Sequence, residues 1–452
     1  PRGKQYWLQE PDSIWYTRTT GIWQTVWMEP VNSDRIQCLK YTPDIDNGTV
    51  RIDYSHTGNK SDCTLELDIS MDEEEVARVS VSHPEMAGNI TVDVFHNQIF
   101  RTSTHHGGWC WSPDNPKLFK VKAVLWRGKE TADEVESYFG MRKIHTDQGM
   151  VYLNNRPFYQ KLILDQGYWK DSLMTARCDE DFKKDILLAK EMGFNGCRKH
   201  QKTEDPRFLY WADRLGYIVW EEIGACVQFS DEAVRRTIDE WMEVVERDYN
   251  HPCIVTWVPL NESWGVPFIS VDRRQQEFSQ TLYHLLKSFD STRLVVGNDG
   301  WEMTETDLCA IHNYDHGEKN DEKAHAKFRE SLSCREELLY TYTAGRKIFV
   351  DGWKDRGQPV LLTEFGGISF AEQDDKAWGY TCIRDGAELE KEYERILDAI
   401  CASDSIAGFC YTQLADVEQE TNGLLTCDRV PKIRTEIIRK INDRVNKKRI
   451  RI

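Results

Sequence analysis

Hydrophobic and polar residues follow two different patterns along the chain, and the change falls near residue 144. Ahead of it, apolar residues alternate with polar ones in short runs bounded by turn residues, which is typical of antiparallel strands. These runs are Arg35–Tyr41, Thr49–His56, Cys63–Ser70, Glu75–Val81, Gly88–Phe95 and Lys117–Trp126. Their spacing predicts a β-sandwich of immunoglobulin type over residues 33–143. Within this region, the adjacent His105 and His106 are expected in a solvated loop.

Beyond residue 144, apolar strand-like runs alternate with helical patterns, such as the face formed by Phe182, Ile186 and Ala189. The predicted strands are Phe158–Leu164, Phe194–Lys199, Tyr217–Glu221, Ile254–Leu260, Leu294–Gly297, Leu308–His312, Pro359–Thr363 and Ile406–Thr412. Eight strands with intervening helices predict a (β/α)8 barrel over residues 144–452. The active site of such a barrel forms where its strands end.

Two predicted strands of this barrel end on a glutamate. Glu262 follows the fourth strand, beside Asn261 and Trp264, and Glu364 follows the seventh strand ahead of two glycines. A carboxyl group at the end of a buried strand can have a raised pKa, which suits a proton donor. Either glutamate alone would more often be structural. As a pair facing each other across the barrel mouth, they predict the two carboxylates of a glycosidase.

The motifs Asn-Glu-Ser-Trp at 261–264 and Thr-Glu-Phe-Gly-Gly at 363–367 resemble two signatures of glycoside hydrolase family 2. This family includes β-galactosidases, β-glucuronidases and β-mannosidases. The resemblance implies that Glu262 is the acid/base, that Glu364 is the nucleophile and that Asn261 hydrogen-bonds the sugar 2-hydroxyl. In a retaining glycosidase the two carboxyl groups lie about 5–5.5 Å apart.

The resemblance extends to both regions ahead of the barrel. Residues 13–31, with Gly21 at the centre, read as two strands and are similar to the closing strands of the family's jelly-roll sugar-binding domain. Only these last strands fit within residues 1–32, so we expect that domain to be incomplete here. The segments Trp111–Pro116 and Tyr138–Arg142 are similar to family elements that precede the barrel.

Further candidate site residues lie at other strand ends. Arg198 ends the second strand and is positioned to keep the nucleophile ionised, with an ion pair at the barrel rim as its alternative. Tyr314 resembles the family tyrosine that hydrogen-bonds the nucleophile. The remaining predicted substrate contacts are His312, Trp264, Trp301, Trp353 and Gln413, with Trp378 as a further stacking candidate. Their alternative is a place in the protein core.

Three departures from the family pattern bear on cofactor and substrate. Residues 221–226 lack the histidine and second carboxylate of the metal-dependent β-galactosidases, so we expect no catalytic metal and no cofactor. Glu420–Gly423 lacks the lysine with which β-glucuronidases grip the sugar carboxylate, and Glu420 would repel a uronate. Thr412 stands where the family often has a tryptophan under the sugar, so the identity of the bound sugar stays open.

The amino-acid composition disfavours some classes of binding partner and favours others. A net charge of −17 disfavours nucleic acids and anionic membranes, and no apolar run of about 18 residues indicates a membrane span. The 13 scattered cysteines, an odd number, are typical of reduced thiols and favour a cytoplasmic protein. An export signal ahead of the first residue stays open, because the sequence lacks an initiator Met. The 16 Trp and 18 Tyr fit carbohydrate binding.

Together, these features predict a retaining exo-β-glycosidase for a terminal neutral sugar, most simply of β-galactosidase type. Two alternatives stay open: a catalytically silent carbohydrate-binding protein on the same fold, or a family enzyme for another sugar, such as a β-glucosidase or an α-L-arabinoside-cleaving enzyme. β-Glucuronidase activity is disfavoured. Family members often form dimers or tetramers, so a homo-oligomer is also expected among the partners.

Overall fold

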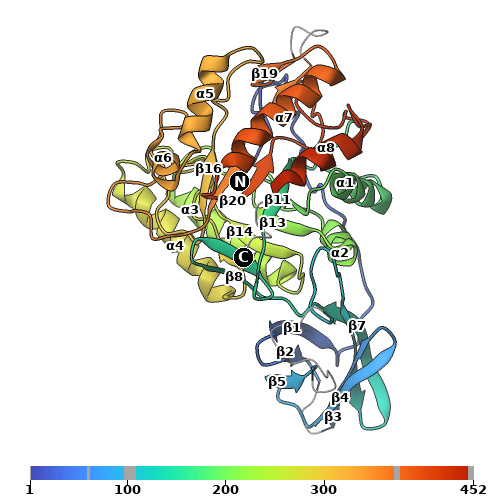
Figure 1. Ribbon diagram of the computed structural model, residues 1–452. Helices are drawn as coiled ribbons and strands as arrows, with labels where there is room; N and C mark the ends of the chain where they lie inside the picture. The colour runs from blue at the N-terminus through green and yellow to red at the C-terminus, as the bar shows by residue number, and fades with distance from the viewer. Residues whose placement is uncertain (1, 59–61, 96–107, 371–376, 446–452) are drawn as a thin grey trace.

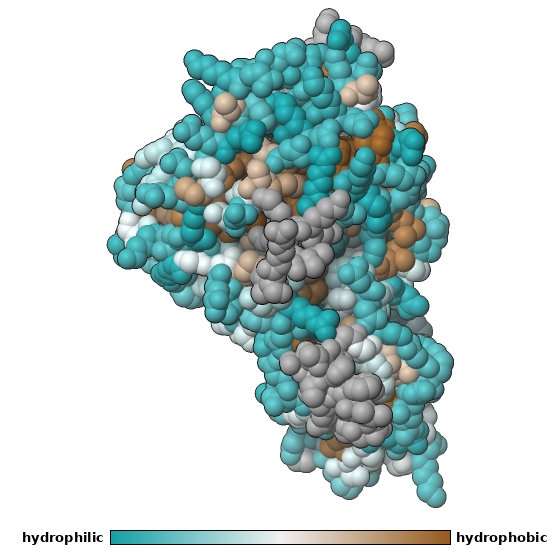
Figure 2. Space-filling view, viewed as in Figure 1, coloured by the Kyte–Doolittle hydropathy of each residue, from teal (hydrophilic) through white to brown (hydrophobic). Residues whose placement is uncertain are grey.

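The structure is a computed structural model that describes residues 2–58, 62–95, 108–370 and 377–445. Figure 1 shows parallel strands ringed by helices in its upper part and antiparallel sheets below them. His105 and His106 lie outside the described residues. Most of the face seen in Figure 2 is hydrophilic, in keeping with the acidic composition. Among the described helices, none is both long and apolar enough to cross a bilayer.

The antiparallel part is a sandwich of two sheets. One sheet has the order β1(Ile36–Asp44), β2(Thr49–His56) and β5(Ala87–Asp93). The other has the order β4(Glu74–Ser82), β3(Cys63–Met71), β6(Phe119–Arg127) and β7(Glu130–Phe139). Side chains of β3 alternate between buried and half-buried, as the pattern of the sequence predicts. Strand β7 was not predicted, because as an edge strand it is mostly polar and masks the alternation.

A small sheet of β8(Ile144–Asp147), β9(Met150–Leu153) and β10(Arg156–Pro157) leads into the barrel. The barrel strands are β11(Gln160–Asp165), β12(Gly196–Lys199), β13(Ile218–Glu222), β14(Ile254–Val258), β15(Leu294–Val295), β16(Cys309–His312), β17(Val360–Glu364) and β20(Ile406–Tyr411). They are buried throughout, which explains their continuous apolar runs. The predicted barrel is confirmed.

The ring of strands closes beyond β15. The eight strands follow the order β15-β14-β13-β12-β11-β20-β17-β16. The chain continues past β15 in extended form, so that Asp299 pairs with Asn261 and Gly300 pairs with Ile311. These two parallel bridges connect the ends of β14 and β16, and they bring Asp299 to the same end of the barrel as the two glutamates.

The helices that surround the strands are α1(Asp179–Glu191), α2(Pro206–Leu215), α3(Asp231–Asp248), α4(Arg273–Phe289), α5(Glu322–Ser331), α6(Arg335–Tyr340), α7(Gly386–Ala402) and α8(Thr435–Asn442). Helix α1 buries the predicted face of Phe182, Ile186 and Ala189. In the loop after β17, two short strands, β18(Ile368–Ser369) and β19(Thr381–Cys382), pair in parallel.

The N-terminal arm, residues 2–34, departs from the prediction of two strands around Gly21. The described part of this arm forms only isolated bridges, between Gln5 and Tyr16 and between Asp12 and Trp15. A strand requires a hydrogen-bonded neighbour, and residues 18–31 have no such neighbour in the described chain. The assignment of residues 1–32 to a jelly-roll domain therefore stays a prediction.

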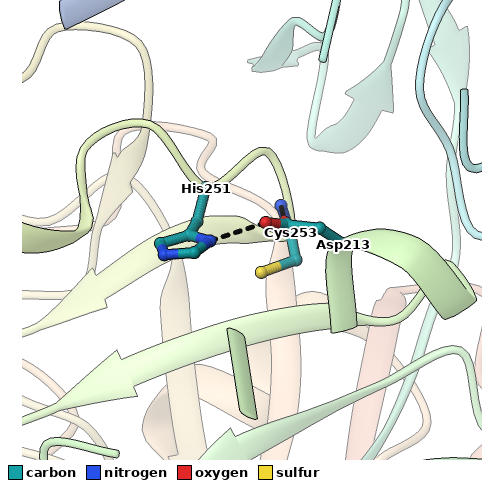
Figure 3. A group of neighbouring side chains, drawn as sticks. All are labelled: Asp213, His251 and Cys253. Atoms are coloured by element: carbon teal, nitrogen blue, oxygen red, sulfur yellow. Dashed lines mark hydrogen bonds and ion pairs between the residues drawn. The ribbon is translucent and has the colours of Figure 1, made fainter. Parts of the chain in front are cut away.

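The sandwich is attached to the barrel at the end opposite the two glutamates. Asp213 of α2 accepts hydrogen bonds from the Tyr138 hydroxyl (2.8 Å), the His251 ring (2.6 Å) and the backbone N–H of Cys253 (2.9 Å). Figure 3 shows the His251 ring directed at the Asp213 carboxylate. The Trp111 indole also donates to the backbone carbonyl of Asp213, at 2.7 Å. Residues of the sandwich and the barrel base thus form one polar cluster.

Arg142 provides a second anchor. Its buried guanidinium donates to the backbone carbonyls of Pro252 (3.2 Å), Thr292 (2.9 Å) and Ile254 (2.9 Å). These carbonyls lie just before or within the fourth and fifth strands of the barrel, so one side chain from the sandwich junction ties two neighbouring strands together.

Replacing Arg142 by Met should lower the free energy of unfolding by about 3 kcal/mol or more, because each buried carbonyl left without a partner costs about 1–3 kcal/mol. Urea titration measures this change. The control is Arg78→Met, which removes an exposed ion pair with Asp68 and should change stability by about 0.5 kcal/mol or less. Equal effects of the two substitutions would contradict the anchoring role of Arg142.

Candidate active site

Glu262 and Glu364 converge at the C-terminal end of the barrel. Glu364 is the last residue of β17, and Glu262 follows β14 in a tight turn, with φ of 52° at Glu262 and 59° at Ser263. Two consecutive non-glycine residues in the left-handed region indicate strain of the kind that collects at functional sites. Hydrogen bonds from Ser263 to Asn298 (3.1 Å) and Glu302 (2.6 Å) hold the turn.

The two carboxylates are close neighbours. One oxygen of Glu262, one oxygen of Glu364 and one ring nitrogen of His312 all lie within 4.8 Å of one another. This separation is near the spacing of about 5–5.5 Å at which one carboxylate attacks a sugar while the other protonates the leaving oxygen. It is shorter than the spacing of about 6.5–9.5 Å that leaves room for an attacking water in inverting glycosidases.

Arg198 at the end of β12 is the centre of the polar network. Its buried Nη2 donates to Glu364 Oε1 at 2.7 Å and to Asn261 Oδ1 at 2.8 Å. Its Nη1 lies 2.8 Å from Asp299 Oδ2, and its Nε donates to Glu222. Three carboxylates thus surround one guanidinium, and the predicted position of Arg198 beside the nucleophile candidate matches this geometry.

These neighbours keep Glu364 ionised. Burial alone would raise the pKa of Glu364, but the charges of His312 and Arg198 outweigh burial and lower that pKa to about 2. The second carboxylate oxygen accepts a hydrogen bond from the Tyr314 hydroxyl at 2.8 Å. Glu364 is therefore an anion at neutral pH, oriented by donors on both of its oxygens.

Glu262 has a different environment. Its side chain is partly exposed, and its Oε1 lies 2.8 Å from Nδ1 of His312. Asn261, the residue before it, leaves its Nδ2 without a protein partner although the atom is buried. A buried amide donor without a protein partner, beside the acid/base candidate in sequence, is suited to a hydroxyl group of a bound ligand.

The tryptophans predicted as stacking platforms lie in different places. Trp301 is nearly buried, with its ring 5.6 Å from that of His312, and Trp264 packs edge-on against Trp15 of the N-terminal arm at 5.0 Å. Trp378 contacts Tyr380 at 4.8 Å. Trp353 lines a separate hollow of about 310 Å³ formed by residues 339–342 and 347–355, away from the strand-end cluster.

Gln413 lies just past β20. Its Oε1 accepts a hydrogen bond from Gln166 at 2.9 Å, while its buried Nε2 has no protein partner. Like Asn261, it offers a free amide donor, although none of the described contacts joins it directly to the two glutamates.

Several members of the network were not predicted from the sequence. Glu222 is the last residue of β13 and Asp299 lies shortly beyond β15, so inspecting every acidic residue at or just past a strand end would have found them. Tyr380 stacks on Tyr314 with ring centroids 3.5 Å apart, and a hollow of about 620 Å³ opens beside the pair. Tyr380 lies in the long loop after β17, where no periodic pattern marks it.

The N-terminal arm also reaches the site, which the sequence did not predict. The Tyr16 hydroxyl donates to Glu420, whose Oε1 also accepts from the Asn422 amide at 3.1 Å. The buried Lys4 lies with its ammonium 5.4 Å from the ring centroid of Trp15. The charges of Glu262, Glu364 and Glu420 all act on Tyr380, so Glu420 lies near the two catalytic candidates.

Two clusters of described side chains have the composition of a metal site. In the first, Glu262, His312 and Glu364, carboxylate neighbours raise the pKa of His312 to about 10 against the opposing effect of burial. A protonated imidazole has no lone pair for a metal. In the second, Asp213, His251 and Cys253, hydrogen bonds occupy the carboxylate, and burial raises the pKa of the Cys253 thiol. The expectation of no metal stays a prediction.

Arg198→Lys should lower the free energy of unfolding by about 3–5 kcal/mol, because one ammonium cannot contact three buried carboxylates at once. Urea titration measures the loss. The control is Arg236→Lys, which alters an exposed pair with Glu232 and should cost about 0.5 kcal/mol or less. A neutral effect of Arg198→Lys would contradict the central role of the guanidinium.

Comparison with known proteins places this geometry in context. The family model described as "Glycosyl hydrolases family 2, TIM barrel domain" matches residues 144–447, and the model "Glycosyl hydrolases family 2" matches residues 35–142. A β-galactosidase of Klebsiella pneumoniae is 26% identical over 330 residues, covering 68% of this chain and 30% of that protein. A β-glucuronidase of Streptococcus agalactiae is 22% identical over 329 residues, covering 65% of this chain and 50% of that protein.

Among solved structures, the chain is similar to a family 2 β-galacturonidase from Eisenbergiella tayi bound to galacturonate. The TM-score is 0.66 at 18% sequence identity, over 91% of this chain and 73% of that one. This likeness concerns the fold. Because the chain spans only 30% of the Klebsiella protein and half of the Streptococcus protein, their activities do not transfer with the match.

Proposed function

Because the chain belongs to glycosyl hydrolase family 2, we propose that it is a retaining exo-β-glycosidase that removes a terminal sugar by double displacement. The observation that carries the proposal is the close pair of carboxylates, Glu262 and Glu364, with oxygens within 4.8 Å. Neighbouring charges hold Glu364 as an anion in a buried site, whereas Glu262 is partly exposed. Two carboxylates in unlike environments suit an acid and a nucleophile.

In the first step, Glu364 attacks the anomeric carbon while Glu262 gives its proton to the leaving oxygen, so the glycosidic bond breaks and a glycosyl ester forms. Water then attacks the same carbon. Glu262 takes the proton of that water, and the ester bond breaks to release Glu364 as a carboxylate. Tyr314 and Arg198 orient the nucleophile, and the free amide of Asn261 is placed to bind a sugar hydroxyl.

For the sugar, we propose a neutral residue of β-galactoside type. Glu420 is near the two carboxylates, and a uronate would meet its charge. The free amide donors of Asn261 and Gln413 instead suit hydroxyl groups. The reaction itself depends on the carboxylate pair and is independent of this choice of sugar.

A uronide is the second candidate, and one observation favours it. Burial raises the pKa of Glu420, and the charge of Lys4 opposes this rise, so an ammonium lies near that carboxylate. Lys4 forms no ion pair within the described part of the chain. It could therefore meet a sugar carboxylate, as would suit the β-glucuronidase and β-galacturonidase among the similar proteins.

A catalytically silent carbohydrate-binding protein on the same fold is the alternative from another class. A binding protein has no need of two juxtaposed carboxylates, one of them held ionised by a buried arginine. The combination of Glu262, Glu364 and Arg198 therefore favours the enzyme.

Hydrolysis of a panel of aryl β-glycosides (galactoside, glucoside, mannoside, glucuronide and galacturonide) together with an α-L-arabinoside tests the proposal. Activity on one of them should vanish in Glu364→Gln, which keeps the shape of the side chain and removes the nucleophile. A panel that is inactive throughout would favour the binding protein. If the wild type hydrolyses a uronide and Lys4→Met abolishes that activity, the substrate is a uronide and the proposal of a neutral sugar is wrong.

Glu262→Gln should lower kcat about 10²–10⁴-fold for glycosides with a poor leaving group and much less for a dinitrophenyl glycoside, whose departure needs no proton. Glu305→Gln is the control, because this carboxylate pairs with the exposed Arg356 and takes no part in the contacts of the site. Equal losses on both substrates in Glu262→Gln would contradict the acid role.

A further inference from the structure

His312 lies between the two catalytic candidates, and neither a place in the core nor a sugar contact accounts for its position. Its Nδ1 is 2.8 Å from Glu262 Oε1, and its Nε2 is 3.5 Å from Glu364 Oε1 and 3.3 Å from Asp299 Oδ1. The ring is fully buried at the end of β16. One imidazole thus connects the acid/base candidate to the nucleophile candidate.

The backbone around the ring is shaped to hold it there. Gly300 has a φ of +107°, and a Cβ on this residue would lie 2.8 Å from Nδ1 of His312. Trp301 covers the ring from another side, with centroids 5.6 Å apart. The glycine therefore allows the chain to pack closely against the imidazole, which a side chain at this position would displace.

The charges that face the ring come from every element packed against it. They are Glu262 after β14, Asp299 after β15, Glu364 of β17, Arg198 of β12 and the neighbouring His200. Arg198, with Nη1 3.3 Å from Nε2, opposes a positive charge on the ring, and burial lowers the pKa of His200 well below its usual value, so that ring is neutral. The three carboxylates outweigh these effects.

We propose that His312 is a positioning residue that carries a fixed positive charge between Glu262 and Glu364 and thereby sets the acid limit of the reaction's pH range. The proposal rests on the proposed function, because it assigns the ring a task in the two-step mechanism. It adds a third ionisable group to the pair of carboxylates.

The task follows from how charge moves during the reaction. Before the first step, Glu364 carries the negative charge and Glu262 is protonated. In the glycosyl-enzyme, Glu364 is a neutral ester and Glu262 is the anion. The negative charge has moved from one side of His312 to the other, and a cation between the two carboxylates stabilises both states without moving. Preorganised charge of this kind needs no rearrangement during the reaction.

A fixed cation beside Glu364 also lowers the pKa of that carboxylate. Free enzyme is active when Glu364 is ionised and Glu262 is protonated, so these two groups define the acid and alkaline limbs of kcat/KM. Removing the cation should raise the pKa of Glu364, and the acid limb should move to higher pH. An opposite charge at this range shifts a pKa by about 1–3 units.

The experiment is the pH profile of kcat/KM for His312→Gln on the aryl glycoside that the wild type hydrolyses. The acid limb, which reports Glu364, should move upward by about one unit or more. His316→Gln is the matched control, because His316 is a buried histidine whose Nε2 contacts the Gly366 carbonyl at 2.8 Å, and its profile should match the wild type. An acid limb that stays in place or moves downward in His312→Gln would overturn the proposal.

A second measurement does not depend on turnover. In the ¹⁵N spectrum of histidine-labelled wild type, the ring signal that disappears in His312→Gln should remain that of an imidazolium up to pH 8, consistent with a pKa raised to about 10 by the carboxylates. Loss of that proton below pH 7 would overturn the proposal. If the wild type hydrolyses no glycoside, the proposed function fails, and the spectrum still decides the charge of His312.

Discussion

The structure of the candidate site depends on the burial of one guanidinium, that of Arg198. Removing such a cation from water costs several kcal/mol unless carboxylates surround it. Here Glu222, Asp299 and Glu364 do so, each from a different strand of the barrel. Arg198 also acts on these carboxylates. Burial alone would raise the pKa of Asp299, but the charge of Arg198 outweighs burial and holds that pKa well below its usual value. The second, third, fifth and seventh strands must therefore close around Arg198 before the nucleophile candidate is in place.

Segments far apart in the chain complete this end of the barrel. The N-terminal arm brings Trp15 against Trp264 and Tyr16 against Glu420, so residues ahead of the sandwich cover the mouth of the barrel behind it. The sandwich itself joins the opposite end through Asp213 and Arg142. Its role in the described structure is attachment at the barrel base, and the arm is the part that reaches the site.

The barrel could be predicted from the sequence because its strands are buried on both faces and read as continuous apolar runs. The two glutamates could be predicted because each interrupts such a run with a charge. Asp299 was missed because the fifth strand is short and the chain reaches the site beyond its end. Tyr380 was missed because a long loop carries it to Tyr314. The strands expected around Gly21 failed for a physical reason: alternation predicts a strand only where a neighbouring strand can pair with it.

The central claim, that Glu364 attacks the sugar, is tested most directly by covalent trapping. Incubation with a 2-deoxy-2-fluoro glycoside bearing a dinitrophenyl leaving group, followed by peptide mass spectrometry, should identify a single glycosyl ester on Glu364. The sugar is the one that the wild type hydrolyses, and Glu262→Gln should accumulate the same ester. An ester on another residue, or turnover of the parent glycoside with no ester at all, would contradict the account.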